Sequence, residues 1–329
     1  MTTTLLKVEN LRIELTTRDG VAPVIDDLSF ELGQNENISF VGESGCGKSM
    51  TALAIMGLLP EKIGRIAGGS ILFDGEDLTK ASPARLRAIR GNEISMIFQE
   101  PMTSLNPVYT VGEQIAEVIR EHQGLGRKAA WDMAADLLDA VRIPNARGRV
   151  SDYPFQMSGG QRQRVMIAMA LACQPKILIA DEPTTALDVT VQAQIFDLLR
   201  DLRKDTGTSI IMITHDMGAV AEMAERMIVM YAGRGAEIGP VDQIIEHARH
   251  PYTKGLISCV PHIVSHLTDD RARLTEVPGI VPGLKDFGKN MCLFASRCNH
   301  RTEECLSARP PMKPFENGQI AACWHAEEV

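Results

Sequence analysis

The stretch Gly42-Glu43-Ser44-Gly45-Cys46-Gly47-Lys48-Ser49 decides the fold, because it fits the phosphate-binding pattern G-x-x-x-x-G-K-[ST] at every fixed position. An apolar run at 38–41 predicts a buried strand before it, and the run at 50–59, closed by Pro60, predicts a helix after it. Glycines let successive N–H groups face one concavity, and the helix start adds its positive end, so the loop holds an anion. Lys48 would reach the β- and γ-phosphates, and the Ser49 hydroxyl would ligate Mg²⁺. The predicted nucleotide-binding residues of this loop are Gly42, Ser44, Gly45, Cys46, Gly47, Lys48, Ser49 and Met50.

Two further apolar runs end in residues that suit nucleotide chemistry. The run at 177–180 leads into adjacent carboxylates, which should project differently because side chains alternate along a strand. Asp181 suits the Mg²⁺ shell of a P-loop nucleoside triphosphatase, and Glu182 is a candidate to polarise the attacking water. The run at 210–214 leads to His215, a candidate to hydrogen-bond the γ-phosphate or the water. A histidine at a strand end is by itself more often structural, but the phosphate-binding loop and the Asp-Glu pair in the same chain favour a catalytic role for His215.

The segment Met157-Ser158-Gly159-Gly160-Gln161 resembles the signature loop of ABC-type ATPases, with Met in the place of the usual first Leu. This is a mild change that conserves volume. The other sequence elements of that family follow in order: Gln99 resembles the Q-loop residue, Ala186-Leu187-Asp188 the D-loop, and His215 the switch histidine. The resemblance covers about residues 5–245, and it is specific because all elements occur together in the right order.

The resemblance implies a mechanism. Two ATPase subunits would pack head to tail, ATP would close the dimer, and hydrolysis would reopen it. One subunit would supply the catalytic residues and the Mg²⁺ ligands, and the other would supply the signature loop as a second anion cradle. The implied catalytic residues are Glu182, His215 and Gln99; the Mg²⁺ ligands are Ser49, Gln99 and Asp181; the further nucleotide contacts are Ser158, Gly159, Gly160, Gln161 and Asp188. The family usually stacks an aromatic residue on adenine, but the nearest position here is Leu15, so the base-binding residue stays unassigned.

Composition limits the alternatives. The 329 residues are 44% hydrophobic and 23% charged, which is typical of a globular chain with one large and one smaller domain. The net charge of -8 argues against nucleic acid as a general partner. No run approaches the roughly 18–20 apolar residues that span a bilayer, and the N-terminus shows no secretory signal. We therefore expect a cytoplasmic protein whose membrane pathway, if it acts in transport, comes from other chains.

Strand and helix patterns predict an α/β fold: a P-loop ABC-type ATPase core with a mainly parallel sheet, an inserted helical subdomain and a small Cys-rich C-terminal extension. The expected ATPase domain is 1–245, with the helical subdomain at about 99–170 and helices at 111–122 and 128–141. The extension is 246–329. Asp74-Gly75 predicts a tight turn after the strand at 71–73.

Four of the seven cysteines fall in the extension, as Cys292, Cys298, Cys305 and Cys323 with spacing C-x5-C-x6-C-x17-C. A cytoplasmic location disfavours two disulfides, whereas four thiolates close a Zn²⁺ site or hold an iron–sulfur cluster. The spacing lacks the C-x2-C pair of most zinc sites, so unliganded thiols stay an alternative. Cys46 admits two interpretations, a low-pKa thiol at a helix start or a small side chain tolerated in a tight loop.

The extension also resembles that of one class of ABC importer. The stretch His250-Pro251-Tyr252-Thr253-Lys254-Gly255-Leu256, the Pro-Gly pairs and the four cysteines are similar to the oligopeptide/dipeptide/nickel importer ATPases, and the whole chain to their dipeptide type. The resemblance implies a [4Fe-4S] cluster on the four cysteines, with Zn²⁺ as the alternative. It also implies two membrane permease subunits, a second and similar ATPase subunit, an extracytoplasmic substrate-binding protein, and a peripheral position on the cytoplasmic face of the inner membrane.

Two other functions compete with peptide import. ABC ATPases of nucleic-acid repair insert long coiled coils between the phosphate loop and the signature loop, and those of translation fuse two cores; this chain does neither. A metal- or redox-sensing role is compatible with the cysteines alone. The transported solute is not readable, because an ATPase subunit does not touch it.

Overall fold

The computed structural model describes residues 3–99, 104–185, 187–260 and 276–328. The chain forms two compact units. The first unit contains residues 1–6, 32–37 and 73–213, and the second contains 7–31, 38–72 and 214–329. No helix in the described ranges combines the length and the apolar character that crossing a membrane requires.

The first unit contains a parallel sheet. Strand β7 pairs in parallel with β6 and with β8, and all five of its residues are buried, as expected for a strand covered on both faces. The elements of this unit are β5 (Glu76–Asp77), η1 (Leu78–Lys80), α2 (Pro83–Ile89), β6 (Ile94–Ile97), α4 (Val111–Gln123), α5 (Arg127–Ala140), α6 (Ala146–Arg149), η2 (Pro154–Gln156), α7 (Gly159–Leu171), β7 (Ile177–Asp181), α8 (Val189–Thr206) and β8 (Ser209–Ile213).

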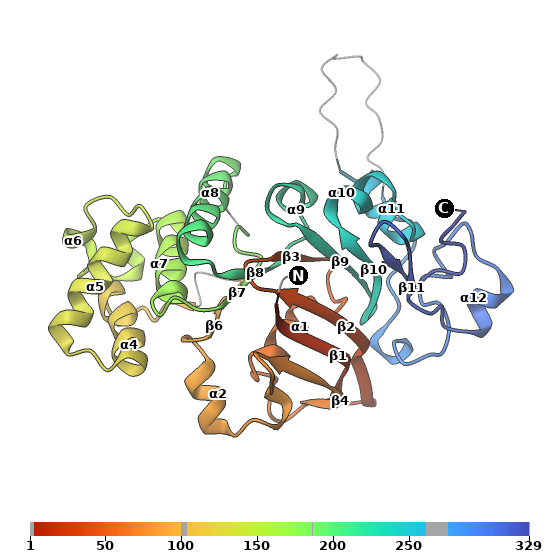
Figure 1. Ribbon diagram of the computed structural model, residues 1–329, viewed down its shortest axis with the longest axis horizontal. Helices are drawn as coiled ribbons and strands as arrows, with labels where there is room; N and C mark the ends of the chain where they lie inside the picture. Colours follow the sequence, from red (N-terminus) through yellow and green to blue (C-terminus); the bar gives the residue numbers. More distant parts are fainter. Residues whose placement is uncertain (1–2, 100–103, 186, 261–275, 329) are drawn as a thin grey trace, which may run out of the picture. The chain divides into compact units, whose positions relative to one another are not determined.

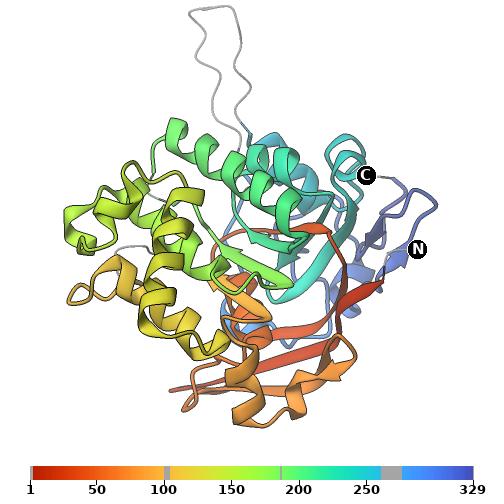
Figure 2. The ribbon, with the colours of Figure 1, turned by 60° about the vertical axis from the view of Figure 1, so that its left-hand side comes forward.

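Helices α4, α5 and α7 pack against one another within this unit (Figures 1 and 2). Helix α4 begins where the Thr110 side chain accepts the N–H of Glu113, and ends at Gly124 in the left-handed conformation. Ile115 and Ile119 lie one turn apart on its buried face. The predicted helices at 111–122 and 128–141 are thus confirmed within one or two residues.

The second unit combines two sheets. In one, β2, β1 and β4 are neighbours in that order; in the other the order is β11, β12, β10, β9 and β3. Strand β9 pairs in parallel with β3 and antiparallel with β10, which in turn pairs with β12. The elements are most of β1 (Thr4–Thr17), β2 (Gly20–Gly33), β3 (Asn37–Val41) and β4 (Gly64–Phe73), then α1 (Lys48–Ile55), α9 (Met217–Met223), β9 (Arg226–Tyr231), β10 (Arg234–Pro240), α10 (Val241–Glu246), α11 (Pro251–Ser258), η3 (Leu284–Asp286), α12 (Glu303–Ser307), β11 (Lys313–Pro314) and β12 (Ile320–Ala321).

Helix α1 is shorter than its sequence predicts, since it ends at Ile55 and not at Leu59. Gly57 takes a left-handed φ of 61°, the N–H of Leu58 bonds the carbonyl of Leu53, and the N–H of Gly57 bonds that of Ala54. This is the Schellman arrangement that glycine favours at a helix C-terminus. The helix therefore stops at the glycine, well before Pro60. The tight turn at Asp74-Gly75 is confirmed, with positive φ at both residues.

The C-terminal segments share a core with β3 and β9. Tyr252 of α11 is fully buried, and its ring lies 4.6 Å from that of Tyr231 and 5.5 Å from that of Phe294. Strands β11 and β12 extend the sheet beyond β10 (Figure 1). The segment predicted as an extension is therefore integrated with the second unit rather than attached as a loose tail.

Candidate nucleotide-binding site

The phosphate-binding loop, residues 42–49, requires glycine at three positions, two of which are fixed in the pattern. Gly42, Gly45 and Gly47 have φ values of 151°, 78° and 107°. A Cβ on Gly42 would lie 2.3 Å from the carbonyl oxygen of Met230, and one on Gly47 would lie 2.4 Å from Cδ1 of Ile25. A Cβ on Gly45 would meet nothing within 4 Å, so that glycine is needed for its backbone angle alone. Gly47 then caps α1 without a side-chain hydrogen bond, and the positive end of the helix faces the loop.

Lys48 starts α1 and is directed back over the loop. Its Nζ donates to the carbonyl oxygens of Gly42, at 2.7 Å, and Glu43, at 3.2 Å. Ser49 and Met50 follow, half-buried, and Ser44 is exposed. Cys46 is buried, and burial raises the pKa of its thiol. A raised pKa opposes the low-pKa interpretation of Cys46 and favours a small side chain packed in the loop.

The two carboxylates at the end of β7 lie in different surroundings. Asp181 ends the strand and is only 4% exposed. Glu182 takes a φ of 45°, unusual for a residue with a side chain, and its N–H donates to the Ile213 carbonyl at 2.8 Å. Its carboxylate accepts from Gln99 Nε2 and from Thr185 Oγ1, both at 2.9 Å. The structure thus brings Gln99 and Glu182 together, and strained backbone of this kind is common at functional sites.

The signature loop is supported from within. Ser158 caps α7: its Oγ accepts the N–H of Gln161 at 3.3 Å, while its own N–H donates to Gln161 Oε1 at 3.1 Å. This reciprocal capping box leaves the N–H groups at the start of the 13-residue helix directed outward. Met157 is buried, consistent with an apolar position. A Cβ on Gly160 would lie 2.9 Å from Cγ1 of Val191, so this glycine also allows α7 and α8 to approach.

The other predicted site residues lie at element boundaries. Asp188 caps α8 by accepting the N–H of Val191 at 2.9 Å, whereas Ala186 lies outside the described residues. His215 is exposed and follows the end of β8 by two residues, just before Asp216 caps α9. Leu15 lies half-buried in β1.

The four extension cysteines lie close enough to influence one another. Burial, and to a lesser degree the neighbouring thiols, raises the pKa of Cys292 and of Cys323 to about 11. Backbone N–H groups approach two sulfurs: His300 N is 3.3 Å from Cys298 Sγ, and His325 N is 3.4 Å from Cys323 Sγ. Within the described part of the chain, no group of three His, Cys, Asp or Glu side chains is arranged to hold a metal ion.

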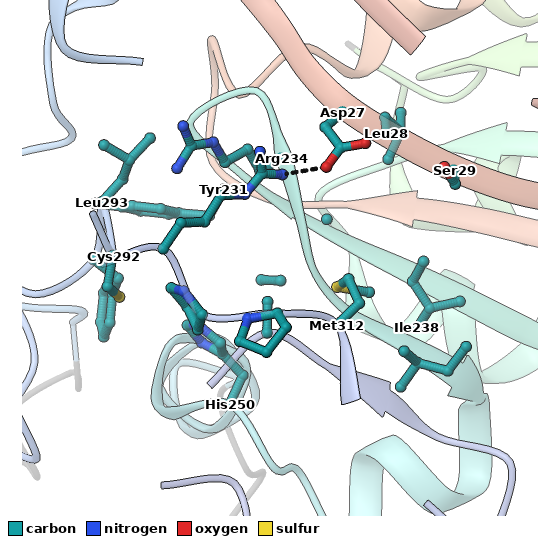
Figure 3. A pocket seen from close by; sticks show the side chains of 18 of the residues that line it. Asp27, Leu28, Ser29, Tyr231, Arg234, Ile238, His250, Cys292, Leu293 and Met312 are labelled. Atoms are coloured by element: carbon teal, nitrogen blue, oxygen red, sulfur yellow. Dashed lines mark ion pairs between the residues drawn. The ribbon is translucent and has the colours of Figure 1, made fainter. Parts of the chain in front are cut away.

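A cavity of about 470 Å³ lies in the second unit, next to Cys292 (Figure 3). Its wall includes Tyr231, Arg234, His250, Cys292 and Arg309. No residue of the phosphate-binding loop lines it, so it is not the nucleotide site. Burial lowers the pKa of His250 to about 4, which keeps its imidazole neutral at physiological pH.

The sequence analysis missed one set of contacts, which join the phosphate-binding loop to the extension. Glu43 N–H donates to Tyr252 Oη at 2.8 Å, and the Glu43 carboxylate accepts two hydrogen bonds from Arg297. These bonds raise the pKa of the Arg297 guanidinium. The partners are 209 and 254 positions apart, so no local pattern announces them.

Comparison with known proteins places this site in a class. Residues 25–185 match the family described as ABC transporter, and residues 236–305 match the oligopeptide/dipeptide transporter C-terminal region. The dimeric ATP-binding cassette MJ0796, solved with ADP and Pi in a post-hydrolysis state, is 26% identical, with a TM-score of 0.64 over 72% of this chain and 98% of its own. CbiO1 of Clostridium perfringens is 27% identical, with a TM-score of 0.62 over 74% of this chain and 91% of its own.

Relatives that match nearly the whole chain have higher sequence identity than these two solved structures. A peptide import ATP-binding protein of Brucella abortus is 46% identical over 99% of this chain and 98% of its own. The oligopeptide transport ATP-binding protein OppD of Haemophilus influenzae is 48% identical over 98% of each. The chain belongs to the ABC transporter family, as an ATP-binding subunit that hydrolyses ATP.

Proposed function

We propose that ATP hydrolysis by this chain energises the uptake of peptides, dipeptides or oligopeptides, through a membrane importer. One observation carries the proposal: a single chain joins the ABC transporter match to the oligopeptide/dipeptide C-terminal match, and relatives that match 98–99% of this chain bear the names of peptide import and oligopeptide transport proteins. The ATPase domain would be 1–245 and the extension 246–329. The chain would work at the cytoplasmic face of the inner membrane with two permeases, a second ATPase subunit, most simply a paralogue, and an extracytoplasmic substrate-binding protein.

The residues would divide the reaction between binding and hydrolysis. The N–H groups of the phosphate-binding loop and the Lys48 ammonium would hold the β- and γ-phosphates. Ser49, Gln99 and Asp181 are the proposed Mg²⁺ ligands, because a hydroxyl, an amide oxygen and a carboxylate are the hard oxygen donors that this ion takes. The bound ion would neutralise charge on the phosphates.

Glu182 is the proposed group that polarises the attacking water. Its hydrogen bonds from Gln99 and Thr185 fix the carboxylate, and a fixed carboxylate can accept a proton from water without first reorganising. His215 is the proposed partner of the γ-phosphate or of that water. Asp188 is a further proposed nucleotide contact.

A second subunit would complete each site. Its signature loop, residues 158–161, would present the Ser158 hydroxyl and the N–H groups of Gly159 and Gly160 to the γ-phosphate. ATP would then close the head-to-tail dimer, and hydrolysis would remove the bridging charge and reopen it.

The cysteine set fits a [4Fe-4S] cluster in its chemistry. Four free thiols influence one another, and N–H groups that approach the sulfurs suit thiolates bound to iron. We propose Cys292, Cys298, Cys305 and Cys323 as its ligands, with Zn²⁺ as the alternative. The group would add to the order of a segment that already contributes Phe287, Leu293 and Phe294 to the core of the second unit.

Uptake by cells tests the peptide assignment. A strain lacking this chain should lose uptake of labelled dipeptides, and the wild-type gene should restore it whereas Glu182→Gln should not. Uptake of a free amino acid serves as the control. Retained peptide uptake with lost nickel or sugar uptake would assign another cargo.

Anaerobic purification with iron, sulfide and zinc analysis tests the cysteine proposal. About four irons and four sulfides per chain with a broad visible absorption would support the cluster, and one zinc without colour would support the alternative. If the purified protein contains neither iron nor zinc, the four cysteines are unliganded thiols.

A further inference from the structure

Glu43 is the point at which the phosphate-binding loop meets the extension. Every polar group of this residue is engaged: its N–H donates to Tyr252 Oη at 2.8 Å, and its carboxylate accepts from Arg297 at 2.7 and 2.9 Å. Its carbonyl oxygen accepts from the N–H of Cys46 at 3.3 Å and from Lys48 Nζ at 3.2 Å. Glu43 is therefore held by residues of the extension, and its carbonyl oxygen in turn holds the ammonium group that would bind the phosphates.

Arg297 is fixed in one position. Its side chain is 2% exposed, and all five of its N–H groups have partners. Besides the two bonds to Glu43, Nε donates to the carbonyl of Pro278 at 2.7 Å, Nη2 to that of Val277 at 3.0 Å, and Nη1 to Tyr231 Oη at 3.4 Å. A guanidinium held by bonds in these separate directions cannot follow the loop if the loop shifts, so it acts as a rigid anchor for the Glu43 carboxylate.

Tyr252 is fixed equally well. Its ring is fully buried among Tyr231 and Phe294, and its own N–H donates to Nδ1 of His250, which caps α11. Its hydroxyl reaches the loop. Because that hydroxyl accepts the N–H of Glu43, it sets the direction of the peptide that opens the phosphate cradle.

We propose that Arg297 and Tyr252 are positioning residues for ATP: acting through Glu43, they set the conformation of the phosphate-binding loop and of Lys48, so that nucleotide affinity depends on the fold of the C-terminal extension. The proposal rests on the proposed role of residues 42–49 in binding ATP. It goes beyond that role, because it assigns part of the control of the loop to residues of the extension. A purely structural bridge would stabilise the fold and leave ATP affinity unchanged.

Equilibrium titration with a fluorescent ATP analogue and Mg²⁺ tests the proposal, in the full chain. Arg297→Lys keeps the charge but loses the two-pronged bond, and Glu43→Gln keeps the shape but loses the charge; each should raise the Kd about 10-fold or more. Tyr252→Phe removes only the hydroxyl and should raise the Kd about 3-fold. In steady-state ATPase assays KM should rise with kcat nearly unchanged, a split that general destabilisation does not produce.

Arg309→Lys is the matched control. Arg309 also lies in the extension, and its ion pairs go to two carboxylates of β2, those of Asp27 at 3.2 Å and Asp26 at 3.6 Å, rather than to Glu43. Its Kd should stay within about twofold of wild type. The double variant E43Q/R297K should bind no more weakly than the weaker single variant, because both remove the same interaction.

Three results separate the outcomes. Unchanged Kd in folded Glu43→Gln and Tyr252→Phe proteins would overturn the proposal, even if Arg297→Lys fails to fold. Equal weakening by Arg297→Lys and Arg309→Lys would also overturn it, as general loosening. A wild-type protein that binds no ATP would instead refute the proposed role of the loop.

Discussion

The phosphate-binding loop and the signature loop both place glycines at the start of a helix, but they are supported in different ways. Ser158 and Gln161 cap the signature loop from three residues apart. The phosphate-binding loop is held at Glu43 by residues 209 and 254 positions away. One cradle is therefore a local property of the sequence, whereas the other depends on how distant segments fold together. A nucleotide-binding loop that is recognisable from its sequence can therefore depend for its conformation on residues outside it.

Glu182 belongs to neither cradle, so its replacement should lower the rate of hydrolysis without weakening ATP binding. This loss of rate is the largest effect that we expect. Glu182→Gln keeps the shape of the side chain but removes the carboxylate. We expect kcat to fall by about 10²–10⁴, with ATP affinity within about twofold of wild type. Phosphate release and analogue titration measure the two quantities, and Asp197→Asn on the exposed side of α8 is the control. A kcat within tenfold of wild type would exclude Glu182 as the group that polarises water.

The remote support of the phosphate-binding loop should be sensitive to pH through His250, which caps the helix that carries Tyr252. Burial lowers the pKa of His250 to about 4, below the unfolded value of 6.5. Its contribution to stability is therefore complete above about pH 6.5 and is lost as the pH falls towards 4, because the unfolded chain binds the proton first. Between pH 7.5 and 5.0 the wild type should lose about 2 kcal/mol more than His250→Asn, which can still cap α11.

Urea unfolding at the two pH values measures that difference. If both proteins lose the same free energy of unfolding between the two pH values, the pKa of His250 does not differ between the native and unfolded states, contrary to what its burial predicts.

Alanine in place of single glycines should distinguish the two cradles. Gly47→Ala combines a φ of 107° with a contact of 2.4 Å to Ile25 and should lower the free energy of unfolding by about 1–3 kcal/mol. Gly45→Ala has the positive φ without the contact and should cost less. Gly159→Ala meets only Leu187, at 3.7 Å, and should stay within about 0.5 kcal/mol. Denaturant titrations in which Gly159→Ala is the most destabilised would reverse the comparison.

Loss of the local cap should give the smallest effect on stability. Ser158→Ala removes the hydroxyl that accepts the Gln161 N–H and should cost about 1 kcal/mol, whereas Ser158→Thr, which retains a capping oxygen, should cost less. Thermal unfolding measures both variants. An alanine variant as stable as wild type would mean that the capping box contributes nothing to α7.

The sequence predicted what depends on neighbouring residues. Apolar runs placed β3, β7 and β8, and turn chemistry placed Asp74-Gly75. The length of α1 was wrong, because Gly57 was not given its weight as a helix terminator. The meeting of Gln99 with Glu182 spans 83 positions, and only the family resemblance brought these residues into one predicted site.

The contacts of Glu43 were beyond prediction for a physical reason. Nothing near Glu43 in the sequence distinguishes it from a solvated surface carboxylate. Its partners become visible only when Tyr252 and Arg297 are buried beside Tyr231 and Phe294 in the core of the second unit. The pKa of Cys46 likewise follows from burial, which the loop's sequence does not reveal.

Amide hydrogen exchange, followed by mass spectrometry on the full chain, tests the central contrast most directly. Peptides covering 42–52 and 158–170 should be compared in wild type, Tyr252→Phe and Arg297→Lys. We expect faster exchange in 42–52 and unchanged exchange in 158–170 for both variants. Equal acceleration in both peptides, or none in 42–52, would contradict the claim that the extension supports the phosphate-binding loop while the signature loop supports itself.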